Sequence, residues 1–460
     1  AQVMKVGSRQ VAAAARQYLN PSGATFCLVK GPSGEAAEKG ASLPGGEGPR
    51  VEHLAGRIPV VVKEDRSLPI VSFSVLMKGG MLFERKETNG LFPILARLLV
   101  CGTSRLSARE ISDRVASWGG SLSPYSGNNS MGLTLTVPKE FWKEGLDLLM
   151  EVVRTPAFPE KELQREKEEA VAGIVAREES APAVAGRILR ERIFGQHPYG
   201  LPEGGTRESV AAITRQLVRD TYHRFFGSDN VVITAFGDID APQVLKALSS
   251  GLGSLPPSSV GQVERFTPAS NGPVTVREVI RKREAVVAIG YPGIAVNDRR
   301  RAVLEVLASV MNQQDGTLFD RLREKEPLVY ATQFSYFLGL EPGMLVFTAQ
   351  CRPDRVERVR QVIGEVIADT IQKPLSQSEL EKNKRKVLGH NRIGRQTLSA
   401  QALDAGLSTL YGMGADHSLR LEQEVLAVTP EDVRAFAQEF FRTDRQVTVI
   451  VSPDDATIER

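Results

Sequence analysis

Residues 218–238 read VRDTYHRFFGSDNVVITAFGD, and residues 433–454 read VRAFAQEFFRTDRQVTVIVSPD. Each stretch has the apolar spacing of an amphipathic helix that ends in a bulky pair, followed by a polar turn, a β-branched strand and an aspartate. The two stretches start roughly 200 residues apart, which is the size of a whole domain. The same order of elements at this distance indicates an internal repeat.

Two further pairs of segments support the same period. One pair leads from a turn into a charged helix, and the other consists of strands that run through a loop into an apolar helix. The pairs are AFPEKELQREKEE (157–169) with PLSQSELEKNKRK (374–386), and LPIVSFSVLMKGG (68–80) with REAVVAIGYPG (283–293). We therefore expect two repeated units, residues 51–249 and 274–460.

Strands and helices alternate within each unit, which favours an α+β class of fold, with α/β sandwich units in which helices pack on a sheet. Residues 34–50 are rich in Gly, Glu, Ala and Pro, and residues 250–273 are rich in Gly, Pro and Ser. Both stretches have few bulky apolar residues. That composition cannot bury enough surface to fold alone. We interpret both stretches as linkers.

Residues 11–32, VAAAARQYLNPSGATFCLVKGP, repeat the helix, bulky pair, polar turn and strand about one period before residues 218–238. No unit body precedes this copy. We interpret residues 1–33 as the tail of a preceding repeat unit, so that the chain would be the C-terminal part of a longer polypeptide. The alternative is a chance match, because a helix followed by a strand is common.

Charge and cysteine content exclude several classes of protein. The 460 residues carry 58 basic and 55 acidic side chains, a net charge of +3, which gives no electrostatic case for binding nucleic acid or a membrane surface. The cysteines, Cys27, Cys101 and Cys351, are too far apart to suggest a disulfide framework or a zinc cluster. No apolar run is long enough to cross a membrane. We expect a soluble protein of unknown compartment.

The order of short motifs resembles the pitrilysin/insulinase family of zinc metallopeptidases, which includes mitochondrial processing peptidase. The matching motifs are Gly90-Leu91 and Gly102-Thr103 around a helix, Gly119-Gly120, FGQHPYGLPEGGTRESV at 194–210, and LFDRLREKEPLVY at 318–330. The resemblance implies that each unit is a processing-peptidase-like α/β sandwich with a mostly antiparallel sheet.

Active members of that family carry an inverted zinc motif, His-x-x-Glu-His, on the helix after the first strand. The two histidines share a helix face and hold one Zn²⁺, and the glutamate acts as base on the metal-bound water. In this sequence the three positions are Pro93, Ala96 and Arg97, and the third ligand position, seven residues after Glu166, is Gly173. None of these side chains can hold zinc. We therefore expect no metal bound by this chain, and no peptidase activity from the chain alone.

Arg323 and Tyr330 lie seven residues apart in LREKEPLVY, as do an arginine and a tyrosine in the C-terminal half of active two-half members of the family. The resemblance implies that they help to bind substrate and to polarise the scissile carbonyl, because a guanidinium and a phenol can both donate to an oxyanion. The alternative is structural, with Arg323 paired to a carboxylate and Tyr330 capping a strand. Pro327, where the family usually has glycine, alters the local backbone.

SLSPYS, residues 121–126, matches the edge strand on which the family pairs an extended substrate through backbone hydrogen bonds. The resemblance makes Ser121, Leu122 and Ser123 candidate substrate-binding residues. Pro124 removes one donor from this strand, and proline on an edge strand also protects against unwanted pairing. A protected edge is therefore the alternative interpretation.

The sequence supports three functional hypotheses. In the first, the chain is the non-catalytic half of a pitrilysin/insulinase-type peptidase. It would form a peptide-binding chamber wall and supply Arg323 and Tyr330 to a zinc site in a homologous partner half, on the same polypeptide or on a separate subunit. In the second, it is a structural or peptide-binding scaffold with no proteolytic partner. In the third, it is an active enzyme with unusual ligands, which zinc analysis of the purified chain would test.

Overall fold

The computed structural model describes residues 7–18, 48–55, 57–268, 272–312 and 315–453. By its internal contacts the chain divides into two compact parts, residues 1–46 and residues 47–460. In the first part the structure describes one helix, α1 (Ser8–Tyr18). The strand and most of the linker that the sequence predicts after this helix, up to residue 47, lie outside the described residues.

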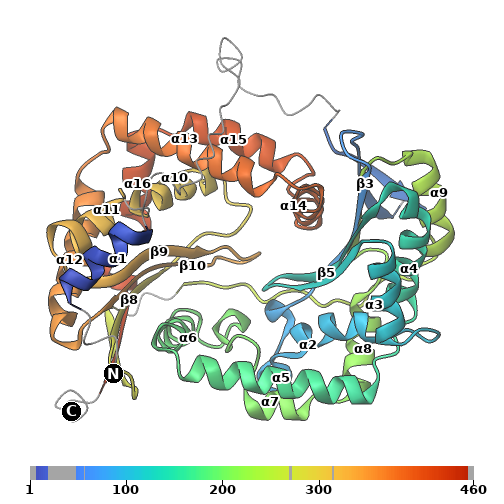
Figure 1. Ribbon diagram of the computed structural model, residues 1–460, viewed down its shortest axis with the longest axis horizontal. Helices are drawn as coiled ribbons and strands as arrows, with labels where there is room; N and C mark the ends of the chain where they lie inside the picture. Colours follow the sequence, from blue (N-terminus) through green and yellow to red (C-terminus); the bar gives the residue numbers. More distant parts are fainter. Residues whose placement is uncertain (1–6, 19–47, 56, 269–271, 313–314, 454–460) are drawn as a thin grey trace. The chain divides into compact units, whose positions relative to one another are not determined.

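In the second part, the strands before residue 240 form a six-stranded sheet in the order β1-β2-β6-β3-β5-β4 (Figure 1). These strands are β1 (Arg50–Leu54), β2 (Ile58–Glu64), β3 (Ile70–Lys78), β4 (Ser121–Ser126), β5 (Ser130–Pro138) and β6 (Val231–Gly237). Only β2 and β6 run parallel. The central strands β3 and β6 are buried along almost their whole length, so both faces of this sheet are covered.

The strands after residue 270 form a five-stranded sheet in the order β7-β11-β8-β10-β9. They are β7 (Val274–Val279), β8 (Ala285–Pro292), β9 (Val329–Phe337), β10 (Met344–Cys351) and β11 (Val447–Ser452). The β7–β11 pair is parallel and the other pairs are antiparallel. The predicted α+β class, with two mostly antiparallel sheets, is confirmed.

Helices cover both sheets. Those before residue 260 are α2 (Leu91–Leu98), α3 (Ala108–Ser117), α4 (Trp142–Arg154), α5 (Glu160–Glu178), α6 (Ala181–Phe194), α7 (Arg207–Ala212), α8 (Arg215–Phe225) and α9 (Ala241–Leu252). Those after residue 300 are α10 (Arg301–Met311), α11 (Thr317–Phe319), α12 (Val356–Gln372), α13 (Gln377–Gly394), α14 (Leu398–Leu410), α15 (His417–Ala427) and α16 (Pro430–Phe440). Several begin with a reciprocal side-chain cap, such as Ser107 with Glu110 before α3 and Thr429 with Asp432 before α16.

Each half of the second part lends one helix to the sheet of the other half. Helix α6, from the first half, packs on β8 and β11, and helix α14, from the second half, packs on β3 and β6 (Figure 1). The contacts are close. A Cβ atom on Gly290 of β8 would lie 2.9 Å from a methyl carbon of Leu189, and one on Gly406 of α14 would lie 2.7 Å from a methyl carbon of Leu76. This exchange makes the two halves depend on each other for burial of apolar surface.

A buried tyrosine joins the two halves at their turns. Tyr199 lies in a short 3₁₀ turn, η8 (Pro198–Gly200), and is fully buried. Its hydroxyl donates to Oδ1 of Asn129, in the β4–β5 turn, and accepts from the backbone N–H of Leu340, in the β9–β10 turn, at 2.9 Å. A single side chain therefore holds hairpins from both sheets together.

Two properties of the described residues bear on the class of protein. None of the described helices is long and apolar enough to cross a membrane. The cysteines that the structure describes, Cys101 and Cys351, are both buried and free.

Candidate functional site

Helix α2 carries the positions of the inverted zinc motif. Pro93 is its third residue, where a backbone N–H has no partner within a helix, so proline is tolerated there. Ala96 is 1 % exposed and faces the core. Arg97 keeps a partly exposed side chain. Proline, alanine and arginine at these positions offer neither a metal ligand nor a base.

Glu166 of α5 is the one acidic member of the motif that the sequence retains, and it is 3 % exposed. Its carboxylate accepts a hydrogen bond from Nε of Arg97 and another, at 3.0 Å, from Nη2 of Arg165. A buried carboxylate needs a positive partner. In this chain two guanidinium groups neutralise Glu166 and leave it no free charge with which to hold a cation.

The third ligand position, Gly173, lies two helical turns further along α5 and is half-buried. A Cβ atom there would only touch the guanidinium of Arg177, at 3.6 Å. Over the described part of the chain, no group of three or more His, Cys, Asp or Glu side chains is placed to hold a metal ion. The residues at the motif therefore do not fit zinc.

Cys101 lies beside this arginine–glutamate cluster, and its thiol donates to the backbone oxygen of Arg97 at 3.4 Å. Burial, together with the nearby carboxylates of Glu166 and Glu162, raises the pKa of the thiol to about 11. A thiol with that pKa is protonated at neutral pH and does not act as a thiolate ligand or nucleophile.

Glu84, which the sequence analysis did not single out, fixes the start of α2. Its buried carboxylate accepts hydrogen bonds from the side chain of Asn89 at 2.8 Å and from the backbone N–H groups of Gly90 and Phe92 at 2.9 Å. A carboxylate at a helix N-terminus satisfies orphan donors and complements the helix dipole. Burial raises the pKa of Glu84, while these three donors lower it. The sequence signal that could have identified Glu84 is its position a few residues before the Gly-Leu pair that begins a helix.

Arg323 bonds across a turn to the residue that precedes Tyr330. Arg323 belongs to a π-helical turn, η9 (Asp320–Lys325), and its Nη1 donates to the backbone oxygen of Val329 at 2.5 Å. Tyr330 is the next residue and is 56 % exposed. In the described part of the chain, no carboxylate forms an ion pair with Arg323. Tyr330 makes no side-chain hydrogen bond within the described part of the chain.

A change of register on β9 exposes Tyr330. Ala331 lies opposite Gln350 of β10, whereas Val329 lies opposite Cys351. Tyr330 is thus an extra residue without a partner on β10, which is the pattern of a β-bulge. Bulges redirect side chains, and they are common beside active sites.

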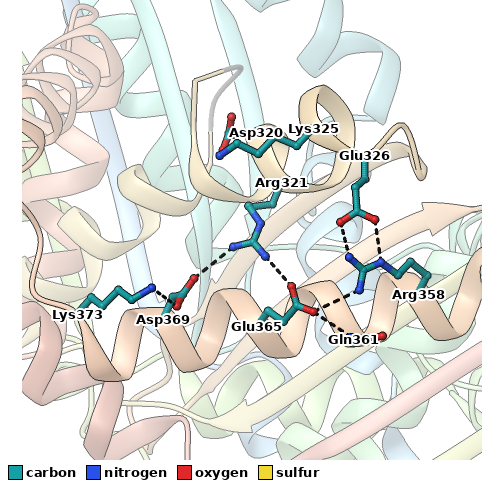
Figure 2. Close-up of polar contacts among 9 residues, drawn as sticks. All are labelled: Asp320, Arg321, Lys325, Glu326, Arg358, Gln361, Glu365, Asp369 and Lys373. Carbon is teal, nitrogen blue, oxygen red and sulfur yellow. Dashed lines mark hydrogen bonds and ion pairs between the residues drawn. The ribbon is translucent and has the colours of Figure 1, made fainter.

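Figure 2 shows a network of charged side chains that ties the η9 turn to α12. Arg321, on η9, bonds to Glu365 at 2.6 Å and to Asp369 at 3.2 Å, and Arg358, on α12, bonds to Glu326 at 2.8 Å. Because the carboxylates bridge neighbouring arginines, the segment that carries Arg323 is held from both ends. A π-helical turn is a strained form of helix, and this network stabilises it.

The candidate substrate residues Ser121, Leu122 and Ser123 lie on β4, at one edge of the six-stranded sheet. Strand β4 pairs with β5 on one side only. Leu122 is half-buried against the core, whereas both serines are exposed. Pro124 lies in the middle of this edge, opposite Leu133. The geometry leaves backbone groups of β4 open to pairing, with one donor missing at the proline.

The fold and the motif helix together define a peptidase-like class of protein whose motif positions offer no zinc ligands. Residues 59–207 match the family model described as "Insulinase (Peptidase family M16)", and residues 212–387 match the one described as "Peptidase M16 inactive domain". The chain belongs to this insulinase family of peptidases, and the resemblance stated from the motifs is confirmed.

Relatives and solved structures agree with that assignment. The chain is 25 % identical over 399 residues to "Uncharacterized zinc protease YmxG" of Bacillus subtilis, covering 85 % of this chain and 96 % of the relative. It is 24 % identical to "Non-peptidase homolog YmxG" of Helicobacter pylori, covering 77 % of this chain and 81 % of the relative. The crystal structure of a peptidase M16 inactive domain from Pseudomonas fluorescens superposes with a TM-score of 0.81 at 19 % identity, covering 88 % of this chain and 98 % of that one.

Proposed function

We propose that this chain is the non-catalytic half of a zinc peptidase of the insulinase type. In this proposal it forms one wall of a chamber around an extended peptide. It presents Arg323 and Tyr330 to a zinc site held by a homologous partner half, on the same polypeptide or on a separate subunit. Zinc would be bound by the partner, because the motif positions of this chain offer it no ligands.

The observation that carries the proposal is the presentation of Tyr330. A tyrosine that is 56 % exposed, on a bulge and without a side-chain partner in the described part of the chain, has an unused phenol donor. The guanidinium of Arg323 bonds to the backbone oxygen of Val329, the residue before Tyr330. In this proposal, both donors act on a developing oxyanion at a site completed by another protein surface.

The retained edge strand supports peptide binding. Strand β4 has an unpaired side, along which an extended peptide could add by backbone hydrogen bonds. Ser121 and Ser123 are exposed on this strand and would lie beside the peptide backbone. Pro124 would limit the length of pairing rather than prevent it, because it removes one donor only.

The decisive experiment begins with the partner. The tagged chain is purified from its source cells, and co-purifying proteins are searched for an intact His-x-x-Glu-His motif. The reconstituted pair should cleave a fluorogenic peptide that neither half cleaves alone. A blot of the same cells shows whether the chain runs near its own 50.2 kDa or as part of a longer polypeptide. The size distinguishes a separate subunit from a fused half.

Tyr330→Phe in the reconstituted pair should then lower kcat by about 10- to 100-fold, because one oxyanion donor is lost. Tyr336→Phe is the matched control. It removes a hydroxyl from the same strand, but that hydroxyl already donates to Glu305 at 2.6 Å. Equal kcat values for Tyr330→Phe and the unchanged protein would remove the role of Tyr330.

A scaffold without a proteolytic partner is the second candidate function. It is favoured by the name of the Helicobacter pylori relative, "Non-peptidase homolog YmxG", and by the neutralised motif cluster around Glu166. In this case the co-purifying proteins would contain no zinc motif, and the chain would still bind extended peptides. Peptide binding that is unaffected by Tyr330→Phe and lost on blocking β4 would support the scaffold.

A further inference from the structure

A second candidate site is a cavity that is lined neither by α2 nor by the bulge on β9. It has a volume of about 690 Å³. Its walls come from α5, α6, residues 202–208, strand β7, Ile280 after β7, and Met344 at the start of β10. A cavity of this size suits a small ligand or the end of a peptide. Neither the motif positions nor the candidate substrate residues line it.

Arg190 of α6 is the unusual residue of this cavity. Its side chain is 10 % exposed, and its Nη2 pairs with Glu203 at 2.7 Å. Its Nη1 is buried and has no hydrogen-bond partner in the described part of the chain. The guanidinium also lies over the ring of Phe337, 5.1 Å from the ring centre. A buried N–H without an acceptor is unfavourable, so Arg190 is only half satisfied.

Glu203 is paired with only one of the two terminal nitrogens of Arg190, Nη2. Its side chain is 56 % exposed, so the carboxylate lies at the solvent edge of the cavity, where it is free to swing away. A guanidinium bonds best to a carboxylate through two parallel N–H donors. A ligand carboxylate that took both Nη1 and Nη2 would therefore bond Arg190 better than Glu203 does.

The other charges around the cavity limit the ligand to one negative charge. The charged lining residues are Arg177, Arg187, Arg190, Arg207, Glu178, Glu203, Glu208 and Glu278. Positive and negative side chains balance, and Arg207 is already paired with Glu178 at 2.6 Å. A polyanion would meet as many carboxylates as guanidiniums. A ligand with a single carboxylate bonded to Arg190 would not place further negative charge beside the glutamates of the cavity.

Apolar side chains supply the rest of the binding surface. Ile174, Val184 and Met344 line the cavity and are buried, and Pro182 and Ile280 line it beside them. These side chains come from α5, α6, and residues close to β7 and β10, so an apolar ligand body would contact both halves of the fold. Burial of such a body provides affinity, and the arginine provides orientation.

We propose that this cavity binds a monocarboxylate with an apolar body, whose carboxylate displaces Glu203 from Arg190. Two sources carry this chemistry: a free amphiphilic acid, or the C-terminal carboxylate of a peptide that ends in an apolar residue. The site is separate from the surface to which the proposed peptidase function is assigned, so each stands or falls alone.

The test is isothermal titration calorimetry of the full chain with two probes. One probe is octanoate, with octanol as its uncharged counterpart. The other is a short peptide that ends in leucine, with its C-terminal amide as counterpart. Binding of octanoate alone identifies a free acid as the ligand, and binding of the peptide acid alone identifies a peptide end. No binding by either acid, or equal binding by the uncharged counterpart, overturns the proposal.

Three variants locate the binding. Arg190→Gln should raise the Kd of the acid probe by about tenfold or more, because a charge-assisted pair is lost. Glu203→Gln should tighten Kd, because the competing carboxylate is removed. Arg434→Gln, which breaks an exposed pair on α16 and does not line the cavity, should leave Kd unchanged and serves as the control. Because Glu203 is exposed, its variant tests the proposal even if Arg190→Gln does not fold. An unchanged Kd in Glu203→Gln contradicts displacement.

Discussion

At the scale of single residues, Arg97 shows how a metal position becomes a structural one. Its guanidinium bonds to Glu166, whose side chain is 4 % exposed. A positive charge thus stays next to the retained carboxylate, but it is supplied by the chain itself. Because the guanidinium of an arginine stays charged at every physiological pH, the carboxylate of Glu166 always has a positive partner.

Arg97→Leu should therefore destabilise the fold by about 1–3 kcal/mol, since it leaves a buried carboxylate with one partner fewer. Urea unfolding measures the change. Arg434→Leu, which breaks an exposed pair with Glu431 inside α16, should cost much less, because solvent screens exposed ion pairs. Adding Glu166→Leu to Arg97→Leu should recover part of the loss, because no unpaired charge is left. A double variant that is less stable than Arg97→Leu would contradict this account.

His197 predicts how stability depends on pH. Its Nδ1 accepts from the backbone N–H of Tyr199 at 3.2 Å, so the proton lies on Nε2, which donates to the backbone oxygen of Glu264 at 3.2 Å. Burial lowers the pKa of His197, and this outweighs the opposite effect of the nearby carboxylates of Glu341 and Glu264. The folded state therefore favours the neutral ring.

Because the pKa of His197 is lower in the folded than in the unfolded chain, its contribution to stability is present above about pH 6.5 and is lost as the pH falls below that value. The loss is at most about 1.4 kcal/mol per pH unit. Urea unfolding between pH 8 and pH 5 measures it. His417, whose pKa is also lowered, contributes in the same direction. The difference between the protein and His197→Asn isolates His197, and a difference independent of pH would refute the assignment.

At the scale of elements, the exchanged helices are the distinctive feature. Helix α14 meets β3 and β6 at Gly406, where a Cβ atom would lie 2.6 Å from Cγ2 of Thr234 and 2.7 Å from Cδ1 of Leu76. Both of these side chains are fully buried in the sheet, so they have no space into which to move. The glycine sets how closely α14 approaches the sheet.

Gly406→Ala should destabilise the protein by about 1–3 kcal/mol, because the methyl group overpacks the interface. Gly389→Ala, in α13, is the matched control, because nothing lies within 4 Å of its Cβ position. Alanine favours a helix over glycine, so Gly389→Ala should stabilise by about 0.5–1 kcal/mol. Thermal unfolding compares the two variants. Stabilisation by both would mean that α14 is not closely packed.

The η9 turn is the second element whose behaviour depends on distant residues. The motif LFDRLREKEPLVY does not reveal that residues 320–325 form a π-helical turn or that Arg321 and Arg358 share Glu365 of α12. Residues that stabilise this turn lie more than thirty positions further along the chain, on a helix whose own sequence carries no sign of the contact. Only packing brings them together.

At the scale of the whole molecule, the two halves of residues 47–460 are mutually dependent. Each sheet is covered on one face by a helix of the other half, and Tyr199 bonds to turns of both sheets. Neither half can bury its sheet alone. We therefore expect the two halves to unfold together rather than as independent domains.

Tyr199→Phe tests this dependence. Loss of the hydroxyl should cost about 1–2 kcal/mol, since Asn129 loses a donor, while Leu340 keeps a second acceptor in Oδ1 of Asn129. Hydrogen exchange should increase in both the β4–β5 and the β9–β10 turns. The control is Tyr222→Phe, whose hydroxyl bonds to Val153 within the first half. Faster exchange in one turn only would show that Tyr199 does not join the halves.

The sequence by itself determined the repeated helix–turn–strand unit, the α+β class, the family, and the loss of ligands at Pro93, Ala96, Arg97 and Gly173. The repeated unit and the class follow from local periodicity. The family follows from the resemblance of its short motifs, and the loss of ligands follows from that resemblance and from side-chain chemistry. None of these needs knowledge of spatial neighbours. The division at residues 249 and 273 and the roles of Arg323 and Tyr330 stay predictions.

The tertiary structure alone decided which helix covers which sheet, the bulge that exposes Tyr330, the pairing of Arg97 with Glu166, and the cavity at Arg190. Hydrophobic burial is not directional, so an apolar helix face in the sequence does not specify the sheet that it covers. Ion pairs between distant residues likewise depend on where the backbone places them. For this reason the sequence alone revealed the loss of zinc ligands from α2. Only the tertiary structure revealed that Nη1 of Arg190, on α6, has no hydrogen-bond partner in the described part of the chain.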